Sequence, residues 1–290
     1  MIELKNINKV FGEKKVLTNI DLSIREGEFI GLIGANGAGK STLMKILVGL
    51  LPNYSGDFYL QNQKITKKTY MNVFLHTKAL IETPQFFPHL TGYENIKYFT
   101  KLDGTFSKHT VLDALDFVNL YDAKDQLFRQ YSLGMKQRLG IARIFASECN
   151  FMILDEPFNG LDPLAKEEIK NILKKLHQEG KTILVSSHLL DELETLSTRI
   201  IYLEQGAILH DIEWHQQQTS TFEISVDLVN SQHFQPGQFK ATIENHIITV
   251  TIERQQLPTF LQHLNVQNIT FYEVVNCTKN LMKYFAQGRE

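Results

Sequence analysis

The segment GANGAGKST, residues 34–42, constrains the fold of this chain more than any other feature. It follows the apolar run EFIGLI and opens a stretch with helical spacing, KSTLMKILVGL. The pattern GxxxxGK[ST] lets backbone amides wrap phosphates, while the lysine reaches the outer phosphates and a hydroxyl binds magnesium. The helix N-terminus adds partial positive charge at the same place. We therefore predict an α/β fold with a phosphate-binding loop formed by Gly34, Ala35, Asn36, Gly37, Ala38, Gly39, Lys40, Ser41 and Thr42.

Within this loop, Lys40 is the expected phosphate ligand and Ser41 the expected magnesium ligand, with Thr42 assisting through its amide or hydroxyl. The alternative is a glycine-rich turn that binds nothing. The strand before the motif and the helix after it argue against that alternative.

Other apolar runs also predict buried strands. The runs FMILDEP and KTILVSSH are continuously apolar, and RIIYLEQGAIL has the form of a strand pair around Gly206. Continuous apolar strands separated by helices indicate a parallel sheet covered on both faces. Between residues 91 and 148 the pattern changes to helices without strands. We predict one α/β domain over residues 1–213, with a helical subdomain at about 91–148.

A second domain is expected over residues 214–290, where the composition shifts toward Gln, Thr and Asn. FEISVDLV and HIITVTI alternate as half-buried strands do, and LPTFLQHL has helical spacing with proline near its start. NITFYEVV reads as a strand, and TKNLMKYFAQG as a closing helix ended by glycine. This pattern predicts a small α+β domain.

Acidic and histidine side chains follow two of the predicted buried strands. Asp155 and Glu156 come at the end of FMILDEP, and His188 ends ILVSSH. Parallel strands place their carboxyl ends at one edge of the sheet, where α/β sheets bind ligands. Asp155 suits magnesium, Glu156 suits the attacking water, and His188 suits a γ-phosphate. The alternatives are two solvated acids and a structural histidine.

Composition limits the partners and the compartment. A net charge of -2 and a pI near 6.6 give no reason to expect nucleic acid. Cys149 and Cys277 lack metal-ligand spacing, which favours two buried thiols in a reducing cytosol. The start, MIELKNINKV, is charged from its third residue and is no signal peptide, and no apolar run reaches the roughly 18 residues of a membrane helix. We expect a soluble chain.

The stretch ALIETPQFFPHLTGYEN, residues 79–95, predicts a stiff, partly apolar loop between a strand and a helix. Thr91 and Glu94 have the spacing of a capping box, in which a hydroxyl and a carboxylate satisfy the first backbone amides of a helix. Glu82 and Gln85 are candidate functional side chains. The local sequence alone leaves open which of the two takes part in chemistry.

The segment YSLGMKQRLGIARIF, together with the phosphate loop, ILDEP, NGLD and SSH in that order, indicates a family. Over about residues 1–210 the chain resembles the nucleotide-binding subunit of an ATP-binding cassette (ABC) transporter. The resemblance implies a P-loop NTPase cassette, with a mixed sheet and a helical subdomain, that hydrolyses ATP with Mg2+. It also implies a head-to-tail dimer of two copies with ATP at the interface.

The resemblance assigns several residues to that interface. Ser132 and Gly134 match the signature motif, which together with Gln137 is expected to contact the γ-phosphate held by the other copy. Leu133 departs from the family's usual glycine, and Tyr131 from its usual leucine. Asp162 in NGLD is expected to span the interface.

Two further residues complete the expected ATP site. Phe11 resembles the family's adenine-stacking aromatic residue, and Val16 is also expected to bind ATP. The alternative for Phe11 is a core phenylalanine.

LIETP followed by FPHLTGYENI is similar to the bacitracin and lantibiotic self-protection branch of the ABC-2 type exporters, and the tail NLMKYFAQG resembles the extension of such subunits. This resemblance implies a subunit that energises export of a peptide antibiotic or similar amphiphile through a separate integral membrane permease. Its expected place is cytoplasmic, peripheral at the inner face of the cell membrane. Family members acting on ribosomes or DNA usually carry two cassettes or long coiled coils, neither of which this sequence has. Lys40, Glu156 and His188 argue against a non-hydrolysing regulatory module.

The resemblance also chooses between Glu82 and Gln85. Counting back from FPHLT, Glu82 aligns with a family glutamine that touches magnesium and the attacking water. The expected magnesium ligands are thus Ser41, Glu82 and Asp155, since a carboxylate binds the metal as an amide oxygen does. Gln85 falls in the transporter-facing loop. The alternative is that Glu82 caps local backbone amides.

Overall fold

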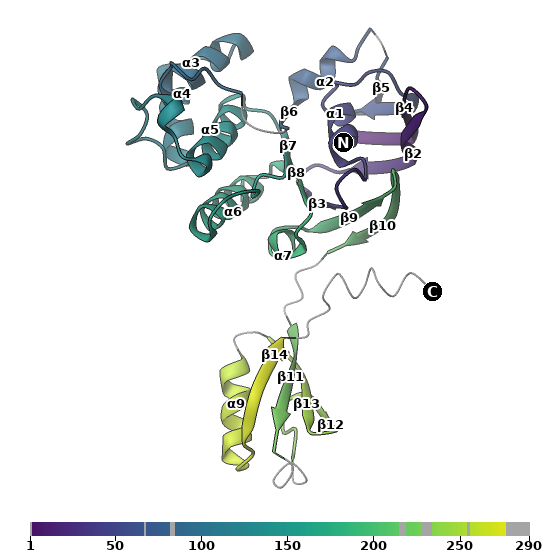
Figure 1. Ribbon diagram of the computed structural model, residues 1–290, viewed down its shortest axis with the longest axis vertical. Helices are drawn as coiled ribbons and strands as arrows, with labels where there is room; N and C mark the ends of the chain where they lie inside the picture. The colour runs from purple at the N-terminus through teal and green to yellow at the C-terminus, as the bar shows by residue number, and fades with distance from the viewer. Residues whose placement is uncertain are drawn as a thin grey trace. The chain divides into compact units, whose positions relative to one another are not determined.

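The computed structural model describes residues 2–66, 68–81, 85–214, 219–227, 234–253 and 256–276. The chain divides into two compact units, Met1–His215 and Gln216–Glu290 (Figure 1). Within the described residues, no helix combines the length and the apolar character needed to cross a membrane.

A six-stranded sheet forms the centre of the first unit. Its strand order is β10-β9-β3-β8-β7-β6. The strands are β3 (Phe29–Ile33), β6 (Thr77–Leu80), β7 (Phe151–Asp155), β8 (Thr182–Ser187), β9 (Arg199–Glu204) and β10 (Ala207–Glu213). All pairs are parallel except β9 and β10, which form an antiparallel pair. The α/β fold class and the buried strands expected from the sequence are confirmed.

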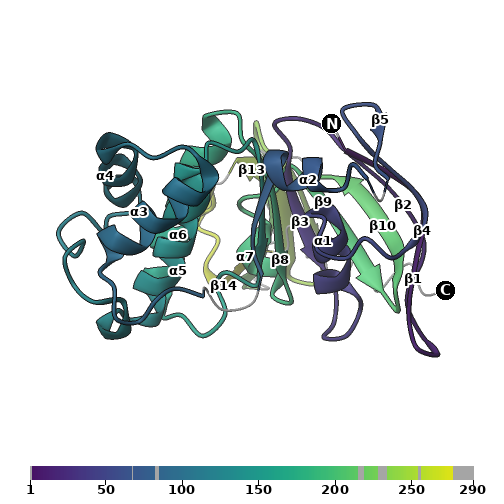
Figure 2. The ribbon, with the colours of Figure 1, turned by 90° about the horizontal axis from the view of Figure 1, so that it is seen from above.

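Helices cover this sheet on both sides. They are α1 (Lys40–Leu47), α6 (Pro163–Gln178) and α7 (Leu190–Leu193). Figure 2 shows α1 on one side of β3 and β8, with α6 and α7 on the other. Every residue of β3, β7 and β8 is buried, as expected for strands covered on both faces.

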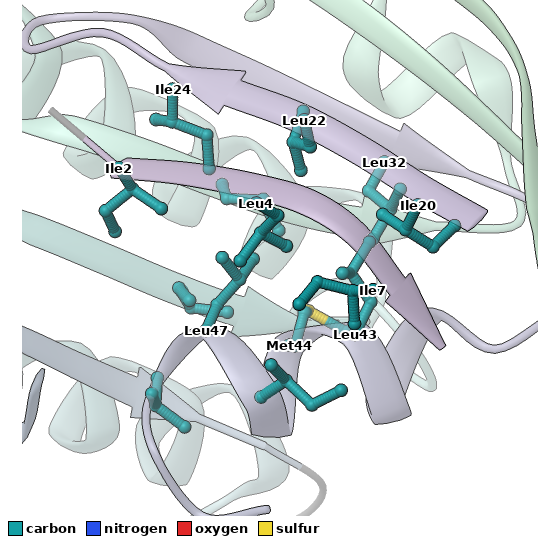
Figure 3. Close-up of a cluster of buried hydrophobic side chains, with 14 of the residues drawn as sticks. Ile2, Leu4, Ile7, Ile20, Leu22, Ile24, Leu32, Leu43, Met44 and Leu47 are labelled. Carbon is teal, nitrogen blue, oxygen red and sulfur yellow. The ribbon is translucent and has the colours of Figure 1, made fainter. Parts of the chain in front are cut away.

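A second, antiparallel sheet packs over α1, and the sequence interpretation did not identify its strands. Its order is β2-β1-β4-β5, formed by β1 (Ile2–Phe11), β2 (Lys14–Ile24), β4 (Ser55–Leu60) and β5 (Gln63–Lys64). The residues buried between this sheet and the helix include Leu4 and Ile7 from β1 and Leu43, Met44 and Leu47 from α1 (Figure 3). This core fixes α1, and with it the phosphate loop that precedes the helix.

A group of helices stands apart from the sheets (Figures 1 and 2). It contains α3 (Gly92–Asp103), α4 (Lys108–Phe117), a 3-10 helix, η1 (Phe128–Gln130), and α5 (Leu133–Ala146), while α2 (Met71–His76) precedes β6. Residues 92–146, all of them described, contain no strand, although Thr91 and Leu127 form an isolated bridge. The expected capping box is confirmed: Glu94 N donates to Thr91 Oγ1 at 3.1 Å, and Thr91 N donates to Glu94 Oε2 at 2.8 Å.

The second unit is a small α+β fold, as expected. Its antiparallel sheet has the order β12-β13-β11-β14, formed by β11 (Thr219–Val226), β12 (Lys240–Glu244), β13 (Ile247–Glu253) and β14 (Phe271–Asn276). Helix α9 (Leu257–Val266) contributes Phe260 and Leu264 to a core shared with the sheet. The expected closing helix TKNLMKYFAQG and Cys277 lie outside the described residues.

Candidate functional site

The loop after β3 adopts a shape that two of its glycines make possible. A Cβ on Gly34 would lie 2.3 Å from the carbonyl oxygen of Leu203. Gly39 has φ 110°, and a Cβ there would lie 2.9 Å from the carbonyl oxygen of Val16. Side chains at either position would therefore clash with backbone. The loop thus delivers Lys40 to the first turn of α1, where backbone amides and the helix dipole favour an anion.

Lys40 is buried, with 6% of its surface exposed. Its Nζ donates to the carbonyl oxygens of Gly34 at 2.7 Å and Ala35 at 3.5 Å, and it lies 3.4 Å from Glu156 Oε1. These three neighbours hold the ammonium group at the cleft, and the two longer contacts are weak enough to be exchanged for a phosphate oxygen. The geometry suits the phosphate contact expected of Lys40.

Ser41 and Asp155 meet although 114 residues separate them. Ser41 Oγ donates to Asp155 Oδ2 at 2.7 Å, and Ser186 Oγ donates to the other carboxylate oxygen at 2.6 Å. The β7–β8 register pairs Asp155 with Ser186, so the parallel sheet itself aligns them. The sequence interpretation missed Ser186. A polar side chain in the otherwise apolar run TILVSS was the available signal.

Glu156 follows directly and is held from three sides. Its amide donates to Ser186 Oγ at 2.9 Å, its Oε2 lies 2.7 Å from His188 Nδ1, and its Oε1 faces Lys40. Its φ is 49°, an uncommon backbone conformation for a residue other than glycine. Oε1 is buried and makes no hydrogen bond with any described residue. An acceptor in that position suits a water molecule beside the phosphates.

Lys40, Ser41, Asp155 and Glu156 line one cleft of about 390 Å³. Its walls are Lys14, Val16, Ala35, Asn36, Gly37, Gly39, Lys40, Ser41, Thr42, Asp155 and Glu156. Of the other loop residues, Ala38 is buried and Gly34 packs against Leu203. The loop, Val16 and both acids therefore come together as the sequence predicts.

Phe11 is 47% exposed at the end of β1, with Lys9 Nζ 4.7 Å from its ring centroid. The core alternative for Phe11 is therefore wrong. The exposed ring is compatible with the adenine-stacking hypothesis.

The donor set suits magnesium only in combination with phosphate oxygens. Ser41 Oγ and Asp155 Oδ2 lie 2.7 Å apart at the N-terminus of α1. Among the described residues, no group of three or more His, Cys, Asp or Glu side chains could hold a metal by itself. A hard cation takes six oxygen ligands and commonly draws some from substrate phosphates. Glu82, the third expected ligand, lies outside the described residues.

The signature residues lie away from this cleft. Ser132 is exposed and caps α5, with its Oγ accepting from Met135 N at 3.2 Å. A Cβ on Gly134 would come within 3.0 Å of Ala165 Cβ, so glycine allows α5 to approach α6. In both views α5 lies on the opposite side of the unit from α1 (Figures 1 and 2). One chain therefore does not bring Ser132 to its own phosphate loop.

Gln137, the remaining residue expected to contact a second copy, lies on the inner face of α5 in the single chain. It is only 5% exposed, and its Oε1 makes no hydrogen bond with a described residue. Gly134, Gln137 and Ile141 are three and four residues apart and share the buried face of α5. The helical period of the sequence therefore predicts that Gln137 lies on the buried face of α5.

Tyr131, next to the signature serine, and Asp162 each make a local hydrogen bond. Tyr131, where the family usually has leucine, is 3% exposed and donates from Oη to the carbonyl oxygen of Ala123 at 2.8 Å. Burial raises its pKa to about 12. Asp162 is exposed and caps α6, with Oδ1 accepting from Ala165 N at 2.9 Å.

The loop before α3 is held by a residue that the sequence interpretation missed. Asn95 is fully buried, and its Oδ1 accepts from Phe87 N at 2.9 Å while its Nδ2 donates to the carbonyl oxygens of Phe87 and Thr91. Phe86 packs its ring between Phe99 and Phe128, at centroid distances of 5.6 Å and 5.1 Å. These contacts make residues 85–91 a well-defined surface, with Gln85 exposed.

Cys149, two residues before β7, is buried as expected. Burial raises the pKa of its thiol, which keeps it protonated and unreactive.

The chain is similar to known proteins over most of its length. The family described as ABC transporter matches residues 17–159. YhcH of Bacillus subtilis (strain 168), an uncharacterized ABC transporter ATP-binding protein, is 33% identical over 99% of this chain and 95% of its own length. BcrA of Enterococcus faecalis, a bacitracin transport ATP-binding protein, is 40% identical over 78% of this chain and 74% of its own.

A solved structure shows the same arrangement of elements. The dimeric ATP-binding cassette MJ0796, in a post-hydrolysis state bound to ADP and Pi, superposes with a TM-score of 0.66 at 29% identity. The match covers 74% of this chain and 99% of that chain.

Proposed function

This chain belongs to the family of ABC transporter ATP-binding proteins, and we propose that it powers export of a peptide antibiotic or similar amphiphile through a separate membrane permease. Its family makes it an ATP-binding ATPase subunit with an α/β P-loop NTPase fold. The substrate class rests on the similarity to the bacitracin transport protein BcrA.

One observation carries the catalytic part of the proposal: two strand ends supply the charged groups of one cleft, and a third strand end holds its acids. The loop after β3 supplies Lys40, and β7 supplies Asp155 and leads into Glu156. Ser186 of β8 and His188 after it contact these acids without lining the cleft. Buried acidic, basic and hydroxyl groups have few other reasons to meet at one sheet edge.

Each residue then has a role in ATP hydrolysis. Lys40 binds the outer phosphates, and Glu156 orients the attacking water through Oε1. The phosphoryl transition state is loose, so positioning the nucleophile matters more than deprotonating it. His188 holds Oε2 of Glu156 through Nδ1 and presents its other ring nitrogen to the γ-phosphate. Ser41 and Asp155, together with Glu82, would hold Mg2+, which supplies charge neutralisation between the phosphates.

We propose that the working form is a head-to-tail dimer. Ser132 is exposed on α5 and does not line the cleft. A second copy placing its Ser132, Gly134 and Asp162 at this cleft would complete the site. The ATP-binding site of each copy would then include groups of both chains.

The permease contact is proposed for the loop and helix from residue 82 to residue 100. The surface includes Gln85 and Tyr98, and Tyr98 is 43% exposed. Aromatic side chains that are half exposed suit a protein partner, because they bury much area at low entropic cost. The subunit would then lie at the inner face of the cell membrane, held by the permease. The second unit is proposed to make dimer or permease contacts, since its described residues carry no phosphate-binding loop.

Three measurements test the proposal. The purified chain should release phosphate from ATP, and this release should require magnesium. An affinity-tagged chain expressed in its own host should retain one integral membrane protein after detergent extraction, and cells lacking the subunit should become more sensitive to bacitracin-like peptides. Phosphate release without any membrane partner, together with unchanged sensitivity, would leave the ATPase intact and refute the export role.

A further inference from the structure

Three side chains outside the cleft link α6 to the loop that carries His188. Lys166 Nζ on α6 lies 2.8 Å from Glu192 Oε1 on α7. Ser187 Oγ, at the end of β8, donates to Glu192 Oε2 at 2.7 Å. One carboxylate therefore joins three elements that are separate in sequence.

Stability alone does not explain why the carboxylate of Glu192 is buried. The side chain of Glu192 is only 9% exposed, and Ser187 is fully buried. Burying a carboxylate is unfavourable unless its oxygens are paired, and well-packed apolar residues often stabilise a fold equally well. Here each oxygen of Glu192 has its own partner, so both the position and the orientation of the carboxylate are fixed. Such pairing also restricts the backbone of the partner residues.

His188 is the residue whose backbone this pairing restricts. Ser187 Oγ, which donates to Glu192, also accepts from Leu189 N at 2.9 Å. The residues on both sides of His188 are therefore fixed by one hydroxyl. Successive side chains of a strand point to opposite faces, and Ser186 accordingly faces the acids of β7 while Ser187 faces α7.

The other end of the link lies on the helix that Asp162 caps. Lys166 follows Asp162 by one turn of α6. Glu168, on the same helix, lies 3.6 Å from Arg138 of α5 through its Oε2 and the arginine Nη1. Helix α6 is thus connected by one ion pair to α5, which Ser132 caps, and by another to Glu192 of α7, whose hydrogen bond with Ser187 reaches the loop of His188.

We propose that Glu192 is a positioning residue for ATP hydrolysis. Together with Lys166 and Ser187 it sets the backbone around His188, and it carries a displacement of α6 at the dimer face to the γ-phosphate side of the cleft. This inference rests on the proposed function, because it assumes that His188 and Glu156 act in hydrolysis. It adds Lys166, Ser187 and Glu192 to the residues on which turnover depends.

Steady-state kinetics of three variants test the link. Glu192→Gln keeps the shape of the side chain and removes its charge, while Ser187→Ala cuts the connection to the loop and leaves the ion pair. Each should lower kcat about 3- to 10-fold, as expected for a slightly misplaced catalytic group, with KM for ATP unchanged. The double variant should be no slower than the slower single variant, because both act through one path.

The control removes a comparable ion pair elsewhere. Lys78 Nζ lies 2.9 Å from Asp103 Oδ1 between β6 and α3. Asp103→Asn should leave kcat and KM of the isolated subunit unchanged. The melting temperature of each variant shows whether lost activity follows lost stability.

A His188→Ala background separates positioning from general structure. If Glu192 acts through His188, adding Glu192→Gln to His188→Ala should not change the residual single-turnover rate. A further drop of the same size in that background would overturn the inference, as would single variants with wild-type kcat. A wild-type chain that binds ATP without hydrolysing it would overturn the proposed function and this inference with it. Hydrolysis that Glu192→Gln and Ser187→Ala leave unchanged would overturn this inference alone.

Discussion

His188 Nδ1 lies 2.7 Å from Glu156 Oε2, although 32 residues separate the two along the chain. The contact occupies one oxygen of the carboxylate and turns the other toward Lys40. Glu156 is thus oriented before any ligand is considered, and its buried Oε1 makes no hydrogen bond with a described residue. The role of each group in turnover can be tested separately.

Replacing the proposed water-positioning carboxylate should stop turnover but not binding. Glu156→Gln keeps an oxygen or amide group beside His188 and loses the negative charge. We expect phosphate release to fall by about a hundredfold or more, the range for a positioned acid–base group, with ATP affinity retained. Size-exclusion chromatography with ATP should then show a trapped dimer. Steady-state hydrolysis within threefold of the wild type would refute the assignment.

The exposed signature serine predicts complementation between two inactive chains. Lys40→Ala removes the phosphate ligand, and Ser132→Arg blocks the face that would meet the partner's phosphates. Each homodimer should be inactive, whereas a mixture should contain heterodimers with one intact site. Phosphate release of equimolar mixtures, compared with each parent at the same total concentration, measures this. No recovery at any mixing ratio would count against a site shared between two chains.

Ser186 should matter for turnover because its hydroxyl contacts both acids. Ser186→Ala removes the donor to Asp155 Oδ1 and the acceptor for Glu156 N. We expect kcat to fall roughly tenfold and the magnesium concentration for half-maximal rate to rise, since both acids lose orientation. Ser186→Thr retains the hydroxyl and is the matched control. Equal kinetics for Ser186→Ala and the wild type would exclude this role.

Glu82 remains a proposed magnesium ligand. The magnesium dependence of ATP hydrolysis in Glu82 variants tests this role. Glu82→Ala should raise the magnesium requirement of hydrolysis, while Glu82→Gln keeps an oxygen ligand and should lose less. In the isolated subunit, Gln85→Ala should have little effect on ATPase activity. A magnesium titration of the three variants decides the matter. An unchanged requirement in Glu82→Ala would place Glu82 outside the metal site.

Tyr131 should contribute to stability and not to turnover. Tyr131→Phe removes the donor to the carbonyl oxygen of Ala123, which should cost about 1 kcal/mol of unfolding free energy, with kcat unchanged. The tyrosine pKa is raised from 10.0 to about 12 in the folded chain. A raised pKa means that the folded state holds the proton more tightly, so the contribution is complete below pH 10 and is lost as pH rises toward 12.

Urea unfolding of both chains at pH 8 and across that alkaline range measures the difference. The gap between wild type and Tyr131→Phe should shrink from pH 10 upward. A constant gap would contradict the stated origin of the pKa shift.

The sequence by itself determined the features whose causes are local. The phosphate loop depends on a strand, its glycines and a helix start that follow one another within residues 29–47. Thr91 and Glu94 close a capping box three residues apart, and Ser132 caps α5 within one turn. Apolar runs identified the buried strands, because a strand covered on both faces admits few polar side chains.

The tertiary structure decided every relationship that depends on strand pairing or on which face of an element is covered. Strand β1 is interrupted by bulges, so its residues give no clean alternation, and its packing on α1 became clear only in three dimensions. Ser186 faces Asp155 because β7 and β8 pair in one register, and a shift by one residue would have turned Ser187 there instead. Gln137 lies inside and Glu192 bridges α6 and β8 for a related reason: local sequence specifies an element, whereas contacts across elements depend on how they pack.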